Sequence, residues 1–401
     1  MKIVSFYNNS IEYPFVTSFS EIYLIDHQNN KYADLISSGA VVNIGHKNLK
    51  MISYIEEISK ETEYVFQMFK NKSQVRLGDK LEEITNNDFF YLYRTTSGTE
   101  SVEIAIQIGL QEKGGGGVLF LRDGYHGNSF FLSILFSSLE KMNIFQVKIY
   151  EKKIFSLGID LELDSEGKLN SIKFLSDIEK LFKSGKISLF LLEPFVSFSR
   201  GVFFGKEVLQ EIRKLCDIYG VLLIFDEVVT GFGRFGTWFA YQHYSVIPDL
   251  LCCAKGITSG YAQAGCVMVR DSLKKEFSYY STFAWSGISA EIGLKNIEIL
   301  KDIISLNIKN KSSEIWLQTL KNEITDDNFF IQGDGFLFAI HSKKKFNQLK
   351  MEEQMLSSGI ILAYPTDTTI IVCPPLCLSN EQIIFFAKNI IANMYNFFTK
   401  N

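Results

Sequence analysis

The sequence predicts an α/β fold in which a central, largely parallel sheet is covered by helices on both faces. Short runs of Val, Ile, Leu and Phe, of strand length, alternate with helical stretches through the middle of the chain. Runs without polar alternation are typical of strands buried on both faces between helices. At 401 residues the chain also exceeds the usual size of a single compact core. It is therefore expected to form a large domain and a smaller one.

The elements predicted for the large domain follow one another between residues 89 and 270. The strands are FFYLYR at 89–94, VLFLRD at 118–123, SLFLLEP at 188–194, VLLIFDEV at 221–228, DLLCCAKG at 249–256 and AGCVMVR at 264–270. Helices are predicted at 101–113 and 206–220, where apolar residues recur at helical spacing. The GGGG sequence at 114–117 is expected to be a flexible loop between helix and strand.

The two ends of the chain are expected to form the smaller α+β domain together. The alternating stretch EIYLIDHQNNKYADL predicts an antiparallel hairpin that turns at Gln28-Asn29-Asn30. Two further strands are predicted at 336–342 and 368–376. The predicted parts are 1–44 for the N-terminal portion of the small domain, 45–286 for the large domain and 287–401 for the C-terminal portion of the small domain.

Composition excludes several classes of function. The net charge of −4 and the pI of about 5.9 argue against a nucleic-acid or anionic-membrane surface. No apolar run is long enough for a membrane span, and the first residues contain no apolar leader. Six cysteines without a CxxC spacing are typical of reduced thiols. These features predict a cytoplasmic protein that binds neither membrane nor nucleic acid.

Polar side chains lie at the carboxyl ends of the predicted strands. These side chains belong to residues 94–97 and 123–126, to Glu193, to Asp226 and Glu227, and to Lys255. In open α/β sheets ligands bind outside these strand ends. The sequence therefore predicts a ligand site at this edge of the sheet.

Three of these features together match the needs of pyridoxal 5′-phosphate (PLP). Gly98 and Thr99, after the helix cap Ser97, offer backbone N–H groups to a phosphate, although a helix cap alone explains the same residues. Asp226 could pair with a protonated pyridine nitrogen, whereas a metal is disfavoured because no histidine has a ligand-like spacing near it. Lys255 could be an ordinary surface lysine or an amine with a lowered pKa that forms a Schiff base.

Two further residues are candidates to hold the ring of the cofactor. Tyr125, after the strand that ends at Asp123, could stack on one face of the ring. Val228 could pack against the other face.

Several motifs occur in the order found in a known family and extend over nearly the whole chain. They are SGTESVEIA (97–105), GYHGN (124–128), LLEP (191–194), FDEVVTGFGRFG (225–236), PDLLCCAKGITSG (248–260) and STF (281–283). The sequence resembles the class III (ω-type) aminotransferases, which are PLP enzymes of fold type I. The DEVVTGFGR and AKG blocks are the most specific part of this resemblance.

The resemblance implies a role for each matched residue. Lys255 would carry the cofactor as a Schiff base and move the proton, and Asp226 would pair with the pyridinium. The remaining cofactor contacts would come from Gly98 and Thr99 to the phosphate, Tyr125 and Val228 to the ring, Glu193 nearby, and Thr282 to the phosphate of the partner subunit. The family also implies a homodimer with shared active sites. His46 and Arg234 are interpreted as structural, with Arg234 in an ion pair.

Three departures from the family concern the substrate. Val229 replaces a glutamine that many members carry, and FVSFSRG (195–201) replaces a glycine-rich segment. Ile371 stands where amino-acid-type members place an arginine that binds the substrate's α-carboxylate, and no arginine follows Arg270. The substrate then either lacks a carboxylate beside the reacting carbon, or is bound elsewhere, for instance by Arg94, Arg122 or Arg200.

The function expected from the sequence is transfer of an amino group from glutamate, alanine or an amine to a carbonyl or keto-acid acceptor. A PLP-dependent isomerase, either a racemase or an aminomutase, would use the same lysine and aspartate. A homologue that binds PLP without turnover is the third reading.

Overall fold

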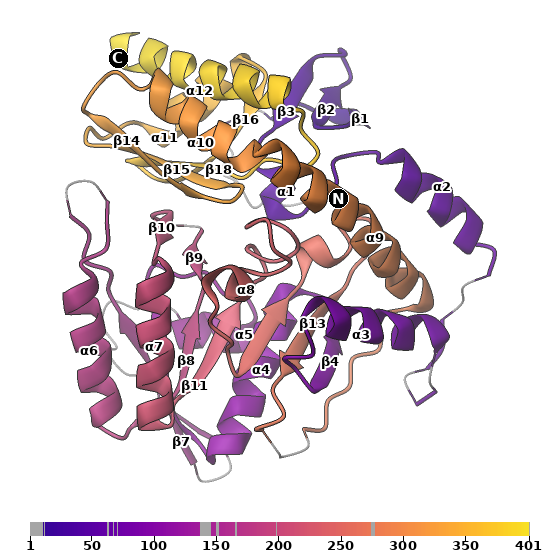
Figure 1. Cartoon of the computed structure of the whole chain (residues 1–401), viewed down its shortest axis with the longest axis vertical. Helices are drawn as coiled ribbons and strands as arrows, with labels where there is room; N and C mark the ends of the chain where they lie inside the picture. The colour runs from indigo at the N-terminus through magenta and orange to yellow at the C-terminus, as the bar shows by residue number, and fades with distance from the viewer. Residues whose placement is uncertain are drawn as a thin grey trace.

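The molecule consists of two stacked units in the computed structural model, which describes residues 11, 13–61, 64–66, 68–69, 71–136, 146–149, 152–164, 167–197, 199–273 and 277–400. The lower unit in Figure 1 contains one large sheet and a two-stranded sheet, Phe195–Val196 (β9) with Val202–Phe203 (β10), and the upper unit contains two smaller sheets under the helix α12. The upper unit combines the indigo N-terminal strands with the orange and yellow C-terminal elements, so the two ends of the chain meet there.

The central sheet has eight strands in the order β4-β13-β12-β11-β8-β5-β7-β6. Their bounds are Tyr91–Thr95 (β4), Gly116–Leu121 (β5), Gln146–Ile149 (β6), Lys152–Ile159 (β7), Ile187–Leu192 (β8), Leu222–Asp226 (β11), Leu250–Cys253 (β12) and Gly265–Val269 (β13). The run from β12 to β7 is parallel, whereas β13 and β6 are antiparallel to their neighbours. The predicted α/β class with a mostly parallel sheet is confirmed.

Both faces of this sheet are buried, which explains the continuous apolar runs. Along β5, Val118 and Phe120 pack in one apolar core and Leu119 and Leu121 in the other. The helix α4 lies across one face, and the helices α6 and α7 cover the other face (Figure 1). The strands are thus covered by a helical layer on each side.

The helices begin and end at residues suited to capping. Ser97 caps α4 by accepting from Glu100 N at 3.2 Å, and Gly220 ends α7 in the left-handed region. Apart from the four-residue turn Ser37–Ala40 (α1), the helices are Leu49–Ile58 (α2), Lys72–Ile84 (α3), Gly98–Lys113 (α4), Phe130–Phe136 (α5), Ser171–Lys183 (α6), Lys206–Tyr219 (α7), Ala240–Tyr244 (α8), Gly287–Asn310 (α9), Ser312–Glu323 (α10), Gln348–Ser357 (α11) and Asn380–Lys400 (α12).

The loop formed by the glycines before β5 is shorter than the sequence predicts. Gly114 ends α4 with a φ of +77°, but Gly116 and Gly117 already belong to β5. A side chain at Gly116 would place its Cβ 2.0 Å from Ser188 Oγ on the neighbouring strand β8. Two of the four glycines therefore serve sheet packing.

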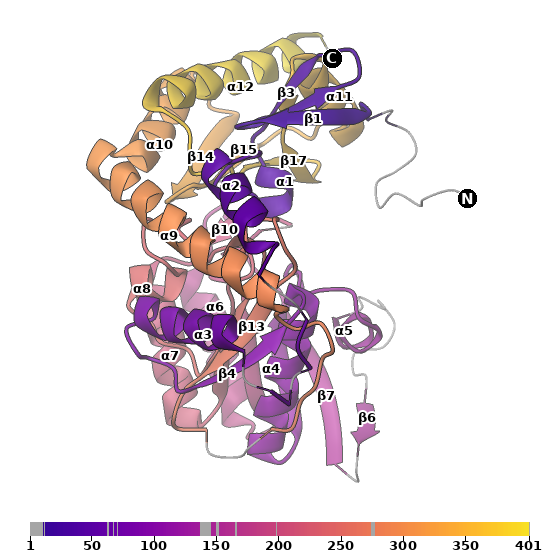
Figure 2. The ribbon, with the colours of Figure 1, turned by 90° about the vertical axis from the view of Figure 1, so that its right-hand side faces the viewer.

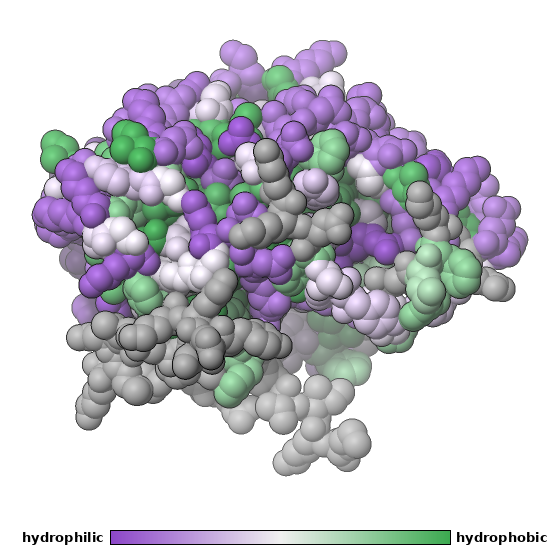
Figure 3. Space-filling view, turned by 90° about the horizontal axis from the view of Figure 1, so that it is seen from below, coloured by the Kyte–Doolittle hydropathy of each residue, from purple (hydrophilic) through white to green (hydrophobic). Residues whose placement is uncertain are grey.

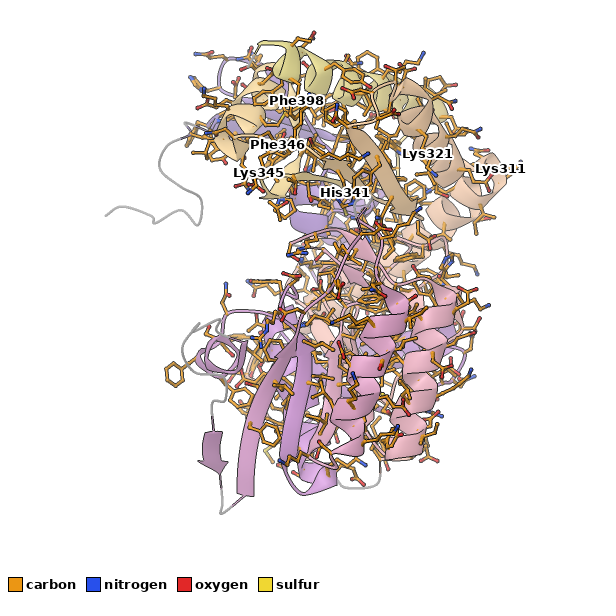
Figure 4. All side chains as sticks on the ribbon, turned by 90° about the vertical axis from the view of Figure 1, so that its left-hand side faces the viewer. Lys311, Lys321, His341, Lys345, Phe346 and Phe398 are labelled. Atoms are coloured by element: carbon orange, nitrogen blue, oxygen red, sulfur yellow. The ribbon has the colours of Figure 1, made fainter. Side chains whose placement is uncertain are left out.

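The upper unit contains the predicted hairpin and joins both chain ends. The strands Tyr23–Asp26 (β2) and Lys31–Asp34 (β3) pair antiparallel, and β3 also pairs with Ile360–Ile361 (β16). The other strands are Val16–Ser20 (β1), Phe329–Asp334 (β14), Leu337–Ser342 (β15), Ala363–Thr366 (β17) and Thr369–Val372 (β18). Figure 4 labels Phe346 and Phe398; Phe398 belongs to α12, and its ring centroid lies 6.2 Å from that of Phe346.

The helix α9 connects the two units. It packs against α2 and α3 at one end and against α10 at the other. Figure 2 shows α9 along its whole length. The domain limits at residues 44 and 286 stay a prediction. None of the described helices is long and apolar enough to cross a membrane. On the lower face shown in Figure 3, hydrophilic and hydrophobic residues are interspersed outside the grey atoms.

Candidate active site

Three neighbouring parallel strands end at the same edge of the sheet, and each has a candidate residue at its end or just after it. Asp226 is the last residue of β11 and lies opposite Cys252 of β12. Lys255 follows β12 after one residue, and Glu193 follows β8 directly. Because β12, β11 and β8 are adjacent in the sheet, the structure brings these three residues together, as the sequence predicts.

Asp226 is buried and held by two hydrogen bonds from its surroundings. Its Oδ2 lies 2.8 Å from His126 Nδ1, and its Oδ1 accepts from Val228 N at 3.1 Å. The next residue, Glu227, points elsewhere and accepts from the first two N–H groups of α8, those of Ala240 and Tyr241. Of this acidic pair, Asp226 belongs to the site and Glu227 stabilises the fold.

His126 is a candidate site residue that the sequence did not single out. It is buried beside Asp226, although it lies in the loop after β5, two strands away from β11. The signal was present in the GYHGN motif, but only Tyr125 received a role. The contact with Asp226 depends on how that loop folds over the strand ends, and spacing does not reveal this.

Lys255 lies in a dry environment with negative neighbours. Burial lowers the pKa of its amine, while Asp226, Cys373 and Glu193 act in the opposite direction. Its backbone has a φ of +44°, an unusual conformation for a lysine, at the start of the short 3₁₀ helix η1 (Lys255–Ile257). An amine with a lowered pKa has a larger neutral fraction, which is the nucleophilic form.

Gly98 and Thr99 lie where three segments meet. A Cβ on Gly98 would lie 2.8 Å from Val228 Cγ1, and a Cβ on Gly127 would lie 2.5 Å from Thr99 Oγ1. The first turn of α4, the loop after β11 and the loop after β5 are therefore in close contact. The N–H groups of Gly98 and Thr99 have no helical acceptor, because they belong to the first turn.

Glu193 and Tyr125 form the next part of the site. Tyr125 N donates to Glu193 Oε1 at 3.0 Å, and Ser197 Oγ donates to Glu193 Oε2 at 2.8 Å. Burial raises the pKa of Glu193 to about 6. The residue Tyr125 is 41% exposed, and burial, followed by the charge of Asp226, raises the pKa of its phenol. Its ring is thus accessible beside Asp226.

The chemistry of this donor set fits PLP. A helix start with free N–H groups suits the phosphate, a buried carboxylate suits the pyridinium nitrogen, and a desolvated amine suits the aldehyde. When bound, PLP supplies an acceptor for the electron pair left by deprotonation of a carbon next to nitrogen.

An apolar cavity of about 270 Å³ lies beside Ser197, the hydrogen-bond partner of Glu193. It is lined by Ile36, Ser38, Gly39, Ala40, Phe195, Ser197, Val229, Leu337, Ala363, Ile371 and Cys373. The lining residue Ser197 donates to Glu193 Oε2 at 2.8 Å, which connects the cavity to this part of the site. Residues at all three departures from the family, Ile371, Val229 and part of the 195–201 segment, thus line this cavity.

One side of the cavity is a left-handed turn, in which residues 37–40 all have positive φ. Such a turn costs energy for residues other than glycine, so its surroundings must hold it. Ser37 Oγ donates to Cys373 O at 2.7 Å, and Asp34 accepts from both Ser38 N and Ser38 Oγ. His46 Nε2 lies 2.8 Å from the same Asp34. The predicted structural role of His46 is therefore to help fix this turn.

Other predicted residues lie outside this group. Arg234 is buried, but its described hydrogen-bond acceptors are the neutral Asn43 Oδ1 and Pro374 O, so the expected ion pair is replaced by neutral acceptors. Thr282 is exposed, and its Oγ1 lies 3.3 Å from Tyr280 OH.

The three arginines considered for substrate binding have other surroundings. Arg122 pairs with Asp160, and Arg200 pairs with Asp123. Arg94 lies opposite Cys266 in the sheet, where burial lowers its pKa. None of the three lines the described apolar cavity.

Comparisons with known proteins agree with this geometry. The family described as "Aminotransferase class-III" matches residues 7–393. The acetylornithine aminotransferase of Methanocaldococcus jannaschii is 26% identical over 375 residues, covering 90% of this chain and 88% of the relative. The adenosylmethionine-8-amino-7-oxononanoate aminotransferase of Staphylococcus aureus is 29% identical over 404 residues, covering 90% and 87%.

A solved transaminase from the marine bacterium Virgibacillus has the same fold. Its TM-score is 0.85 at 22% identity, with 99% of this chain and 97% of that chain covered. The family match, the relatives and the strand-end site lead to one conclusion: this chain belongs to the class III aminotransferases, PLP-dependent enzymes of fold type I.

Proposed function

We propose that this enzyme transfers an amino group between glutamate, alanine or an amine and a carbonyl or keto-acid acceptor, with Lys255 binding PLP as a Schiff base. The observation that carries the proposal is the buried amine of Lys255 at the end of β12, next to Asp226 at the end of β11. Its lowered pKa suits both attack on an aldehyde and transfer of a proton.

Each of the other residues has a role in this proposal. With PLP bound, Asp226 would pair with the ring nitrogen, and Gly98 and Thr99 would donate to the phosphate. Tyr125 and Val228 would pack on the two faces of the ring, and Glu193 holds the loop of Tyr125 by accepting from Tyr125 N. The buried amine of Lys255 would accept the proton of the substrate carbon and release it again.

Reduction with borohydride tests the role of Lys255. The wild type, incubated with PLP and reduced, should carry the cofactor irreversibly on peptide 249–260. Lys255→Ala should remain unlabelled, and the matched control Lys186→Ala, at an exposed lysine, should label like the wild type. Mass spectrometry of the digested proteins locates the label. An unlabelled peptide 249–260 in the wild type would contradict the proposal.

Nitrogen transfer distinguishes an aminotransferase from an isomerase. With ¹⁵N-labelled glutamate, alanine or an amine as donor, label should appear in the product of a carbonyl or keto-acid acceptor. Isomerised substrate with an unlabelled acceptor would instead indicate the racemase or aminomutase reaction.

We propose further that the enzyme is a homodimer with shared active sites. Two pairs of exposed aromatic residues support this: the rings of Tyr64 and Phe283 lie 6.1 Å apart, and those of Phe66 and Tyr280 lie 5.8 Å apart. Thr282 lies among them in sequence. Exposed aromatic groups of this kind favour a protein–protein contact, and they would bring Thr282 to the partner's phosphate site.

Sedimentation and subunit mixing test the dimer. Phe283→Glu should shift the protein toward the monomer, whereas Ile172→Glu, at an exposed residue of α6, should not. Mixed dimers of Lys255→Ala and Thr282→Ala subunits create one intact site if Thr282 acts across the interface. Activity should therefore rise above that of either variant alone, and no rise would refute the shared site.

The compartment and the domain limits are also proposals. All six cysteines are free thiols, and five of them are buried. Free thiols favour a reducing compartment, so we place the enzyme in the cytoplasm. We also retain the domain limits 1–44, 45–286 and 287–401, of which the last begins where α9 begins.

A further inference from the structure

A second apolar cavity, of about 220 Å³, lies within the upper unit. Its described lining residues belong to the segments 13–38 and 352–364, which include the strands β1, β2, β3 and β16 and parts of β17 and α11. Figure 2 shows α11, β1 and β17 in this unit. The cavity shares Ile36 and Ser38 with the one beside Ser197, but none of its described lining residues lies at a strand end of the central sheet. Its position thus differs from that of the site around Lys255.

The walls of this second cavity are mainly hydrocarbon. They include Leu24, Leu356, Ile360 and Leu362, of which the last two are buried. Apolar surface gains free energy when it leaves water, so the body of a ligand in this cavity must be apolar. A cavity of about 150 Å³ accommodates benzene, and 220 Å³ has room for a benzene ring with a short side chain.

The charged groups of this cavity are both carboxylates, since none of its described lining residues is a lysine, an arginine or a histidine. Asp34 is already compensated, because it accepts from Ser38 N and Ser38 Oγ and lies 2.8 Å from His46 Nε2. Glu352 of α11 is half-buried and accepts from Tyr13 OH at 2.6 Å. A carboxylate has about four acceptor sites, so Glu352 can accept further hydrogen bonds from a ligand.

The hydroxyl of Tyr364 is a second, independent indication of a ligand. It is buried and has no hydrogen-bond partner among the described residues, although Tyr364 lines the cavity. A buried hydroxyl that stays unpaired costs free energy. Burial raises the pKa of this phenol, and the charge of Glu352 raises it further, so the two groups lie within electrostatic reach of each other. A ligand that donates to both oxygens would satisfy the phenol.

The arrangement of these groups favours a cation over an anion. Tyr13 is exposed and Glu352 is half-buried, whereas Ile360 and Leu362 are buried, so the carboxylate lies nearer the surface than the apolar walls. A protonated primary amine has three N–H donors and no acceptor, which matches a carboxylate and a phenol oxygen. A carboxylate or phosphate on the ligand would be repelled by Glu352.

We propose that this cavity binds a protonated primary amine with a small apolar body, apart from the cofactor site. The ammonium group donates to the Glu352 carboxylate and to the phenol oxygen of Tyr364, and the apolar body lies between Leu24, Ile360 and Leu362. Because no step at Lys255 is needed for this binding, the inference goes beyond the proposed aminotransferase function.

Calorimetric titration of the borohydride-reduced holoenzyme tests the site, because a reduced cofactor no longer condenses with an amine. The probes are benzylamine, benzyl alcohol and benzoate, which share a phenyl ring and differ in the charge of the polar group. We expect the Kd of benzylamine to be at least tenfold lower than that of benzyl alcohol, since hydrogen bonds to charged groups are the stronger ones. Benzoate should bind most weakly. Equal Kd values for benzylamine and benzyl alcohol, or no binding of benzylamine, overturn the inference.

Variants locate the bound amine. Glu352→Gln should raise the Kd of benzylamine at least tenfold, and the matched control Glu353→Gln, at the next and exposed residue of α11, should leave it within about twofold. Tyr364→Phe should raise the Kd about threefold to tenfold. This variant removes an unpaired hydroxyl, so its unfolding temperature should not fall. An unchanged Kd in a folded Glu352→Gln variant shows that benzylamine binds elsewhere and overturns the inference.

Failure of the inference is distinguishable from failure of the proposed function. If peptide 249–260 is labelled after reduction and benzylamine does not bind, only the second site is wrong. If that peptide is unlabelled and Glu352→Gln still weakens the binding of benzylamine, the second site is supported and the proposed function is wrong.

Discussion

The hydrogen bond between His126 and Asp226 should control how tightly the protein binds PLP. His126→Phe removes a donor that lies 2.8 Å from the carboxylate. A hydrogen bond to a charged group contributes about 1.5–3 kcal/mol, and about 1.4 kcal/mol corresponds to a tenfold change in affinity. If the bond acts through the carboxylate that faces the cofactor, the Kd for PLP should rise roughly tenfold or more, up to ~150-fold.

Titration of the dialysed protein with PLP, followed by absorbance, measures this Kd. His126→Asn is the rescue variant, because its amide can donate from the position of Nδ1, and it should recover most of the affinity. His243→Phe is the matched control, since it breaks another histidine–aspartate contact of 3.0 Å, to Asp334, away from the site. Equal Kd values for His126→Phe and His243→Phe would refute the positioning role, even if both variants were less stable.

Three other substitutions test the geometry around this pair. Gly98→Ala would place a Cβ 2.8 Å from Val228 Cγ1. This overpacking should cost about 1–3 kcal/mol of stability and should weaken PLP binding. The double variant Gly98→Ala, Val228→Ala should recover the unfolding temperature of the wild type. Burial raises the Glu193 pKa from 4.5 to about 6. The free energy of unfolding of the wild type, measured by urea titration, should therefore fall by about 2 kcal/mol relative to that of Glu193→Gln as the pH rises through that interval. A difference between the two proteins that does not change with pH would contradict this. Asp34→Asn weakens the bonds that hold the turn at 37–40 and should cost about 1.5–3 kcal/mol, seen as a lower unfolding temperature.

Much of the fold could be predicted because a strand that is buried on both faces has a continuous apolar run in the sequence. The hairpin at β2 and β3 was predictable for a similar reason, since polar turn residues interrupt an alternating pattern. The antiparallel direction of β13 was not anticipated, although residues 254–264 are too few for a helical crossover from β12. The short connection between β12 and β13 was the signal from which this direction could have been predicted.

Residues of the site were predictable only where they stand at the end of a strand. Asp226 and Lys255 follow apolar runs, and adjacent parallel strands must bring their ends together. His126 reaches Asp226 through a loop, so its contact depends on tertiary folding that no spacing encodes. The turn at 37–40 was equally hidden, because a sequence with a single glycine gives no reason to expect four positive φ values.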